Sequence, residues 1–160
     1  MSDAMAGVFR RILLASHGTP GARAAESAAL DLVAEGGSIR HLYIVADFWH
    51  GMTGDDWLNN AGSRIRYESH LEAELEKDAR AEIDRLSAQA AARGVAYGHV
   101  VAIGKPAKTL LEVAAEGGID LVVIGAPRPK GVKGHRSRLD VEPLVKGLGV
   151  PLLVVPHPGP

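Results

Sequence analysis

Leu121-Val122-Val123-Ile124-Gly125 is the stretch that decides the fold, because four apolar residues, three of them β-branched, end there at a glycine. A second run of the same kind, Leu152 to Val155, lies between two prolines. Short uncharged runs bounded by glycine or proline are typical of strands that are buried on both faces of a parallel sheet. The chain is therefore expected to contain such a sheet, with Gly125 at the carboxyl end of one strand.

The rest of the chain alternates strands with helices. Apolar runs predict three more strands, at Ile12–Ala15, Ile39–Ala46 and Val95–Ile103. Helical spacing of apolar residues predicts helices at Ala22–Glu35, Arg64–Arg93, Lys108–Glu116 and from about Asp140, and the first three are followed by glycines. Strict alternation of this kind predicts an α/β fold, a parallel sheet with helices on both faces joined by right-handed crossovers.

Composition restricts the class of protein. The 160 residues include 18 basic and 19 acidic ones, so a formal net charge of -1 gives no reason to expect nucleic acid or a membrane surface as partner. The absence of cysteine excludes disulfides and thiolate chemistry and fits a reducing cytosol. The start of the chain lacks the pattern of a signal peptide, and no apolar run approaches the ~18 residues of a membrane span. We expect a cytoplasmic protein with a flexible tail over residues 1–9, a single domain over 10–160 and an insertion at about 47–63.

A local basic cluster follows the strand that ends at Gly125. It consists of Arg128, Lys130, Lys133, Arg136 and Arg138, with no acidic residue before Asp140. Ligands of open parallel sheets gather beyond the carboxyl ends of the strands, and a cationic loop there indicates an anionic ligand. Ser16-His17-Gly18 follows the first strand and is expected to face the same ligand.

Several spaced motifs in the carboxyl-terminal half are similar to the universal stress protein family. They are Gly104-x-Pro106-Ala107, Asp120 to Gly125 and Val150 to Pro156, together with Leu110, Ala114 and Glu116 between them. The resemblance covers nearly the whole chain, from Ile12 to Pro156. It implies a five-stranded sheet of order 3-2-1-4-5 and a homodimer formed through the last strand. An apolar edge strand independently favours the dimer, because such an edge is exposed unless something pairs with it.

The resemblance also implies a nucleotide site, from which this sequence departs. The first glycine of the family's nucleotide motif matches Gly125, but the second falls on Arg128 and the closing Gly-Ser or Gly-Thr pair falls on Arg138-Leu139. The acidic residue after the first strand falls on His17, and the adenine contact falls on Val45. Side chains at the glycine positions hinder the approach of backbone amides to phosphate, which argues against ATP binding in the family's usual manner.

Basic side chains offer a replacement for the lost glycines. Arg128, Lys130, Arg136 and Arg138 could hold a phosphate or carboxylate by charge-assisted hydrogen bonds. The sequence therefore predicts a protein that binds or senses a small anionic ligand, with ATP and AMP as candidates, and without obligatory catalysis. No metal site is predicted, since the seven histidines show no short ligand spacing.

Two alternatives belong to other classes of function. The segment from Trp49 to Trp57 holds both tryptophans, and as a long insertion it could dock a protein partner of a dimeric adaptor. Ser16-His17-Gly18 is also similar to the opening motif of histidine phosphatases and of small cobalt chelatases, which would make His17 a nucleophile or a metal ligand. The residue before His17 is serine where the phosphatases carry arginine.

Overall fold

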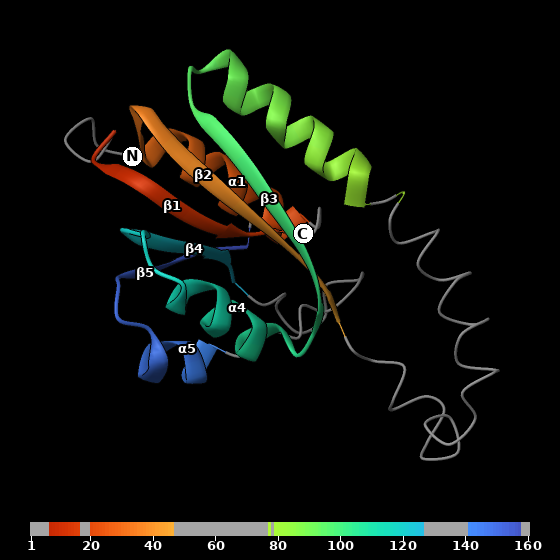
Figure 1. The fold of residues 1–160 in the computed structure, drawn as a ribbon, viewed down its shortest axis with the longest axis vertical. Helices are drawn as coiled ribbons and strands as arrows, with labels where there is room; N and C mark the ends of the chain where they lie inside the picture. The colour runs from red at the N-terminus through yellow and green to blue at the C-terminus, as the bar shows by residue number, and fades with distance from the viewer. Residues whose placement is uncertain (1–6, 17–19, 47–76, 78, 127–140, 158–160) are drawn as a thin grey trace.

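The computed structural model describes residues 7–16, 20–46, 77, 79–126 and 141–157. They form eight labelled elements in strict chain order, drawn in Figure 1: β1 (Phe9–Ala15), α1 (Pro20–Leu32), β2 (Val33–Ala46), β3 (Ala96–Gly104), α4 (Pro106–Ala115), β4 (Leu121–Gly125), α5 (Val141–Gly147) and β5 (Leu152–Val155). A further helix covers residues 79–92, between β2 and β3. None of the helices in these residues is long and apolar enough to cross a membrane.

The strands form one parallel sheet in the order β3-β2-β1-β4-β5, which confirms the predicted order 3-2-1-4-5. The apolar runs that predicted β4 and β5 are strands, and β4 is fully buried from Leu121 to Ile124. Both faces of β4 are covered, which explains why its residues are apolar without alternation.

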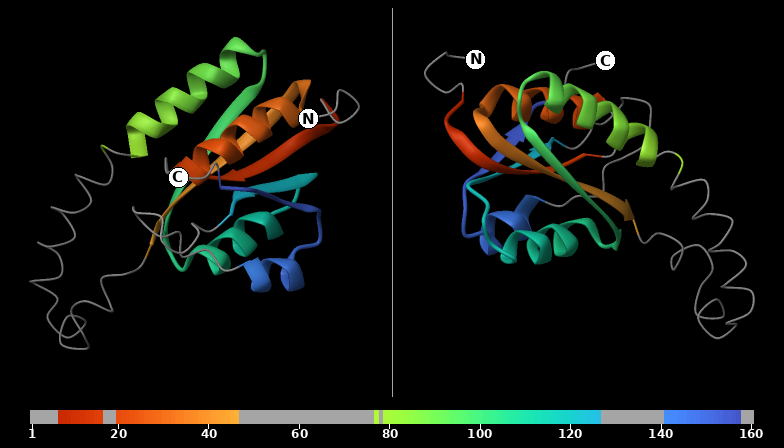
Figure 2. Two further views of the ribbon diagram at one scale, coloured as in Figure 1. Left: turned by 180° about the vertical axis from the view of Figure 1, so that it is seen from behind. Right: turned by 45° about the horizontal axis from the view of Figure 1, so that its top comes forward.

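Helices cover the two faces of the sheet in two separate layers (Figures 1 and 2). Side chains of α1 and of the helix over residues 79–92 pack against one face, around Ile12, Leu14 and Val123. Side chains of α4 and α5 pack against the other face, around Leu13 and Val122. Successive strand residues point to opposite faces, so neighbouring residues of β1 and β4 contribute to different cores.

The first helix ends earlier than the sequence predicts. It stops at Leu32 and not at Glu35, and β2 begins at Val33 instead of Ile39. Gly36-Gly37 therefore lies inside the strand, where the pairing with β1 is irregular. Gly36 has a φ of +77°, and a Cβ on Gly37 would lie 2.7 Å from the carbonyl oxygen of Arg10. The two glycines thus allow an irregular strand to approach β1, and they do not act as a helix stop.

Other boundaries differ by one to three residues. β1 begins at Phe9, and α4 begins at Pro106, two residues before the predicted Lys108. Proline is well suited to the first position of a helix, because its missing N–H would have no partner there and its φ is already helical. The predicted glycine stops hold after α4, where Gly117 and Gly118 have positive φ, and after residue 92, where Gly94 does.

Candidate functional site

The predicted ligand site lies at the carboxyl ends of β1 and β4, and the structure describes part of it. Leu14 pairs with Val123, so Ser16 and Gly125 each lie two residues farther along neighbouring strands. Val45 lies near the carboxyl end of β2, where its backbone pairs with Ile103 of β3. The other predicted ligand residues lie outside the described part of the chain: His17, Gly18, Arg128, Lys130, Arg136 and Arg138. The segment from Trp49 to Trp57 lies outside it too.

Ser16 is the described residue of this site that has the most polar contacts. Its amide donates to the carbonyl oxygen of Leu42 at 3.2 Å, and its hydroxyl donates to Oε1 of Glu26 at 2.6 Å. Its carbonyl oxygen lies 2.9 Å from Nε2 of His41. Only 2% of Ser16 is exposed. The structure therefore shows Ser16 turned into the protein, where it supports the end of β1 from three directions.

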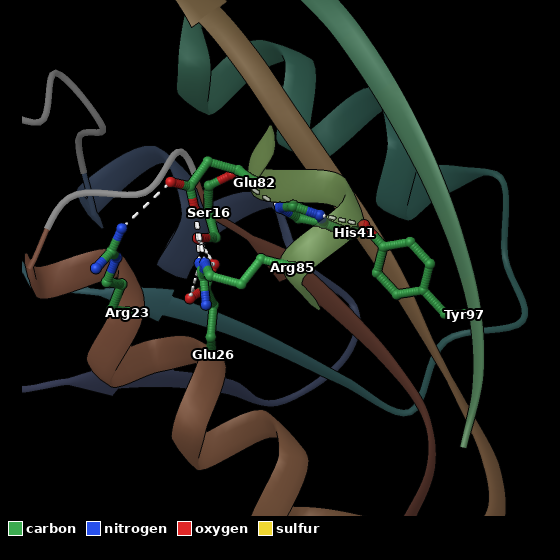
Figure 3. Close-up of polar contacts among 7 residues, drawn as sticks. All are labelled: Ser16, Arg23, Glu26, His41, Glu82, Arg85 and Tyr97. Atoms are coloured by element: carbon green, nitrogen blue, oxygen red, sulfur yellow. Dashed lines mark hydrogen bonds and ion pairs between the residues drawn. The ribbon is translucent and has the colours of Figure 1, made fainter. Parts of the chain in front are cut away.

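Glu26 is the buried acid at the centre of this cluster (Figure 3). It lies on α1 between Ala25 and Ala29, which face the core, and only 2% of it is exposed. Arg85, from the helix over residues 79–92, donates from one terminal nitrogen to Oε1 at 2.9 Å and to Oε2 at 2.7 Å. A buried carboxylate is costly unless it is paired and hydrogen-bonded, and Arg85 together with Ser16 meets both conditions.

Glu82 and Arg23 extend the cluster toward the surface. Arg85 also donates to Glu82, one turn before it on the same helix, and Arg23 of α1 reaches Glu82 at 3.4 Å. Burial alone would raise the pKa of Glu82, but hydrogen bonds and the charge of Arg85, assisted by Arg23, outweigh burial and lower it. Burial likewise opposes the charged form of Arg85, and its bonds to Glu82 and Glu26 outweigh burial and raise its pKa. The two carboxylates and the two guanidinium groups thus form a balanced network.

His41 holds the opposite side of Ser16. It is fully buried, and its Nδ1 lies 2.6 Å from the hydroxyl of Tyr97. A carbonyl oxygen only accepts, so Nε2 must carry the proton that it donates to Ser16, and in the neutral ring Tyr97 donates to Nδ1. Burial lowers the pKa of His41 despite the opposing effects of the Ser16 carbonyl and the Glu26 charge. Burial, followed by the charge of Glu26, raises the pKa of Tyr97.

The lowered pKa of His41 predicts a specific dependence of stability on pH. Because folding lowers this pKa below its ordinary value of about 6.5, the unfolded chain binds more protons just below that pH. The free energy of unfolding is therefore expected to decrease as the pH falls below about 6.5, well before the window of Glu82, which begins below about 4.5. Urea denaturation between about pH 8 and about pH 5 would measure this decrease in the free energy of unfolding. His41→Gln should abolish the decrease. If the free energy of unfolding of the variant falls with pH as it does in the wild type, the decrease does not come from His41.

The sequence contains a signal for the burial of Glu26. Ala22, Ala25 and Ala29 are buried at spacings of three and four, and Glu26 lies on the same stripe, four residues before the buried Leu30. An acid on the apolar stripe of a helix indicates a buried partner. Nothing local identified that partner, because Arg85 is 59 residues away.

Among the residues that the structure describes, no group of three His, Asp or Glu side chains is placed to hold a metal ion.

Comparison with known proteins places the chain among a group of similar folds. The model of the universal stress protein family matches residues 9–156. No curated protein sequence matches the chain. Solved structures that resemble it include a hypothetical protein used as a test case for assigning function from structure, with a TM-score of 0.74, 16% identity and coverage of 94% of this chain and 98% of that one.

Two further solved structures carry family names. The universal stress protein UspA from Lactobacillus plantarum has a TM-score of 0.69 and 18% identity, over 91% of this chain and 96% of that one. A universal stress protein family protein from Arabidopsis thaliana with AMP bound has a TM-score of 0.62 and 11% identity, over 92% of this chain and 91% of that one. At these identities the structural likeness supports the fold alone.

Proposed function

Because this chain belongs to the universal stress protein family, we propose that it binds a small anionic ligand without obligatory catalysis, and AMP and ATP are the first candidates. The observation that carries the proposal is the reversal of strand order between β1 and β4. From β1 the chain continues to β2 and β3 on one side, and it then crosses to β4 and β5 on the other. Open α/β sheets bind ligands at such a point, beyond the carboxyl ends of the two strands.

The residues around this point suit an anion. Gly125 ends β4 and has no side chain to obstruct a ligand, and the basic cluster that contains Arg128 and Arg138 follows it in the sequence. We expect His17 and Gly18 to approach the ligand from the end of β1, and Val45 to lie beside an adenine ring at the end of β2. The AMP bound to the Arabidopsis thaliana protein, which shares this fold, makes AMP the first nucleotide to test.

A homodimer in the cytoplasm is the proposed assembly and setting. β5 is the last strand of the sheet on its side, and in the described part of the chain it pairs only with β4. Leu152 to Val155 are partly buried, so an apolar strand edge remains there. Pairing with the same strand of a second copy would cover that edge.

The nucleotide proposal predicts a defined pattern of binding. Mass spectrometry of ligands released from protein purified without added nucleotide, and titration with AMP and ATP followed by tryptophan fluorescence, would measure it. Arg128→Ala is expected to weaken binding by about tenfold or more, because it removes a charge-assisted hydrogen bond.

Arg80→Ala is the matched control. Arg80 is an exposed arginine on the helix over residues 79–92, and its replacement should leave nucleotide affinity unchanged. If no nucleotide is recovered and none binds, AMP and ATP are wrong as the ligand, and other small anions are to be tested. Equal weakening by the two substitutions would show that nucleotide is attracted by general charge and not held at the predicted site.

A further inference from the structure

The carboxyl end of β1 depends on side chains from several other elements. The hydroxyl of Ser16 is held by Glu26 of α1, its carbonyl oxygen by His41 of β2, and its amide by the backbone of β2. His41 is itself bonded to Tyr97 of β3. Ser16 cannot rotate or shift without giving up a hydrogen bond in a buried place, where an unmade bond is costly. That a ligand would bind at this end of β1 rests on the function proposed above.

Glu26 joins Ser16 to the helix over residues 79–92. Within the described part of the chain, its Oε1 accepts from both Ser16 and Arg85, and its Oε2 accepts from Arg85. The two donors that compensate this buried carboxylate thus come from different elements, one at the end of β1 and the other on the helix. Figure 3 shows the three side chains converging between α1 and that helix. Loss of either donor leaves the carboxylate less well compensated and alters the environment of the other.

Arg85 makes the most buried ion pair that the described residues form between this helix and α1. The apolar side chains of the helix, among them Leu86 and Ala90, pack in the same core as those of α1. Figure 2 shows the two helices on the same side of the sheet. Among the described residues, two other ion pairs reach α1. Glu82 of the helix, 17% exposed, pairs with Arg23, 57% exposed, and Arg93, one residue after the helix, pairs with Asp31 with both side chains about half exposed. Exposed pairs contribute little to stability. The pair between Arg85 and Glu26 is more buried than either of these.

We propose that Glu26 is a positioning residue that couples the carboxyl end of β1 to the docking of the helix over residues 79–92. One carboxylate holds Ser16 and Arg85 together, so the orientation of Ser16 and the seating of the helix depend on each other. Arg85 lies in the middle of this helix, so a change at the end of β1 would reach the helix through Glu26 and Arg85. The coupling exists without ligand and would tune a ligand site at that end.

A double-mutant cycle read by amide hydrogen exchange tests the coupling in the full chain without ligand. Ser16→Ala is expected to speed exchange in residues 79–92 by about tenfold, because it removes a hydrogen bond to a buried charge. Exchange in α4, on the opposite face of the sheet, should stay within about twofold and serves as the internal reference. Arg85→Lys keeps the positive charge but loses the fork that spans both carboxylates. In that background, Ser16→Ala should change exchange in residues 79–92 by less than about twofold.

Equal effects of Ser16→Ala in both backgrounds would overturn the proposal, as would no effect on residues 79–92. Glu26→Gln distinguishes a local effect on the helix from a general loss of stability. Glutamine keeps one acceptor for Ser16 but places an N–H group opposite Arg85. It should speed exchange in residues 79–92 with α4 unchanged, and equal acceleration in both helices would also overturn the proposal. AMP titration of the same samples reports the proposed function separately. If AMP does not bind but the cycle is non-additive, only AMP as the ligand is refuted. If AMP binds but the cycle is additive, only the coupling is refuted.

Discussion

Replacement of Arg85 by methionine is expected to lower the free energy of unfolding by about 3–5 kcal/mol, the range found when one partner of a buried ion pair is removed. The reason is Glu26, which would remain 2% exposed with a single hydroxyl donor in place of a guanidinium group. Methionine keeps the unbranched apolar stem of arginine, so the loss reflects charge and hydrogen bonding more than volume. Urea denaturation at neutral pH would measure it.

Arg93→Met is the control for this prediction, because Arg93, one residue after the same helix, pairs with Asp31 of α1. Both side chains of that pair are about half exposed, and the substitution should cost less than about 1 kcal/mol. A similar small cost for Arg85→Met would mean that Glu26 does not depend on Arg85 for compensation. Glu26→Leu combined with Arg85→Met should recover most of the loss, since an apolar pair replaces a buried ionic one at little net cost.

Leu144→Ala is expected to lower the free energy of unfolding by about 2–5 kcal/mol. Leu144 is the fully buried residue of α5 and packs into the core beneath α4, so alanine would leave a cavity there. Its neighbour Val145 is 69% exposed, and Val145→Ala should change stability by no more than about 0.5 kcal/mol. Thermal or urea denaturation of the two variants compares adjacent positions of one short helix. Equal decreases in the free energy of unfolding for the two variants would show that the packing of Leu144 does not anchor α5 to the core.

The sheet could be predicted from the sequence because its signals are local. β3 and β4 end at a glycine and β5 is followed by a proline, and β4 and β5 have the predicted limits to within one residue. The resemblance in the carboxyl-terminal half supplied the strand order, which the structure confirms. The end of α1 was predicted wrongly because Gly36-Gly37 is a good helix stop in isolation. Only the pairing of Phe9 with Val33 shows that the chain is already in a strand at that point.

The candidate site was less predictable because its interactions are distant in sequence. Ser16 was predicted from its place after a strand, and the structure shows what supports it there. Glu26, His41, Arg85 and Tyr97 were not predicted as parts of the site. Even for Glu26, whose place on the apolar stripe of α1 signals burial, nothing local identifies the partner, because the hydrogen bonds that define these roles connect residues 10 to 59 positions apart. The predicted basic ligands, Arg128 among them, remain a prediction of the sequence.

The distance between Glu26 and Arg85 along the chain also bears on synthesis. When the ribosome has released α1 and β2, the acid on the core-facing stripe of α1 has no guanidinium partner, since that partner is encoded 59 residues later. A nascent chain of this length would have to keep that stripe open to water or hold the acid protonated. Closure of this layer is thus expected to await emergence of the helix over residues 79–92, which makes the amino-terminal half dependent on later segments for completion of its fold.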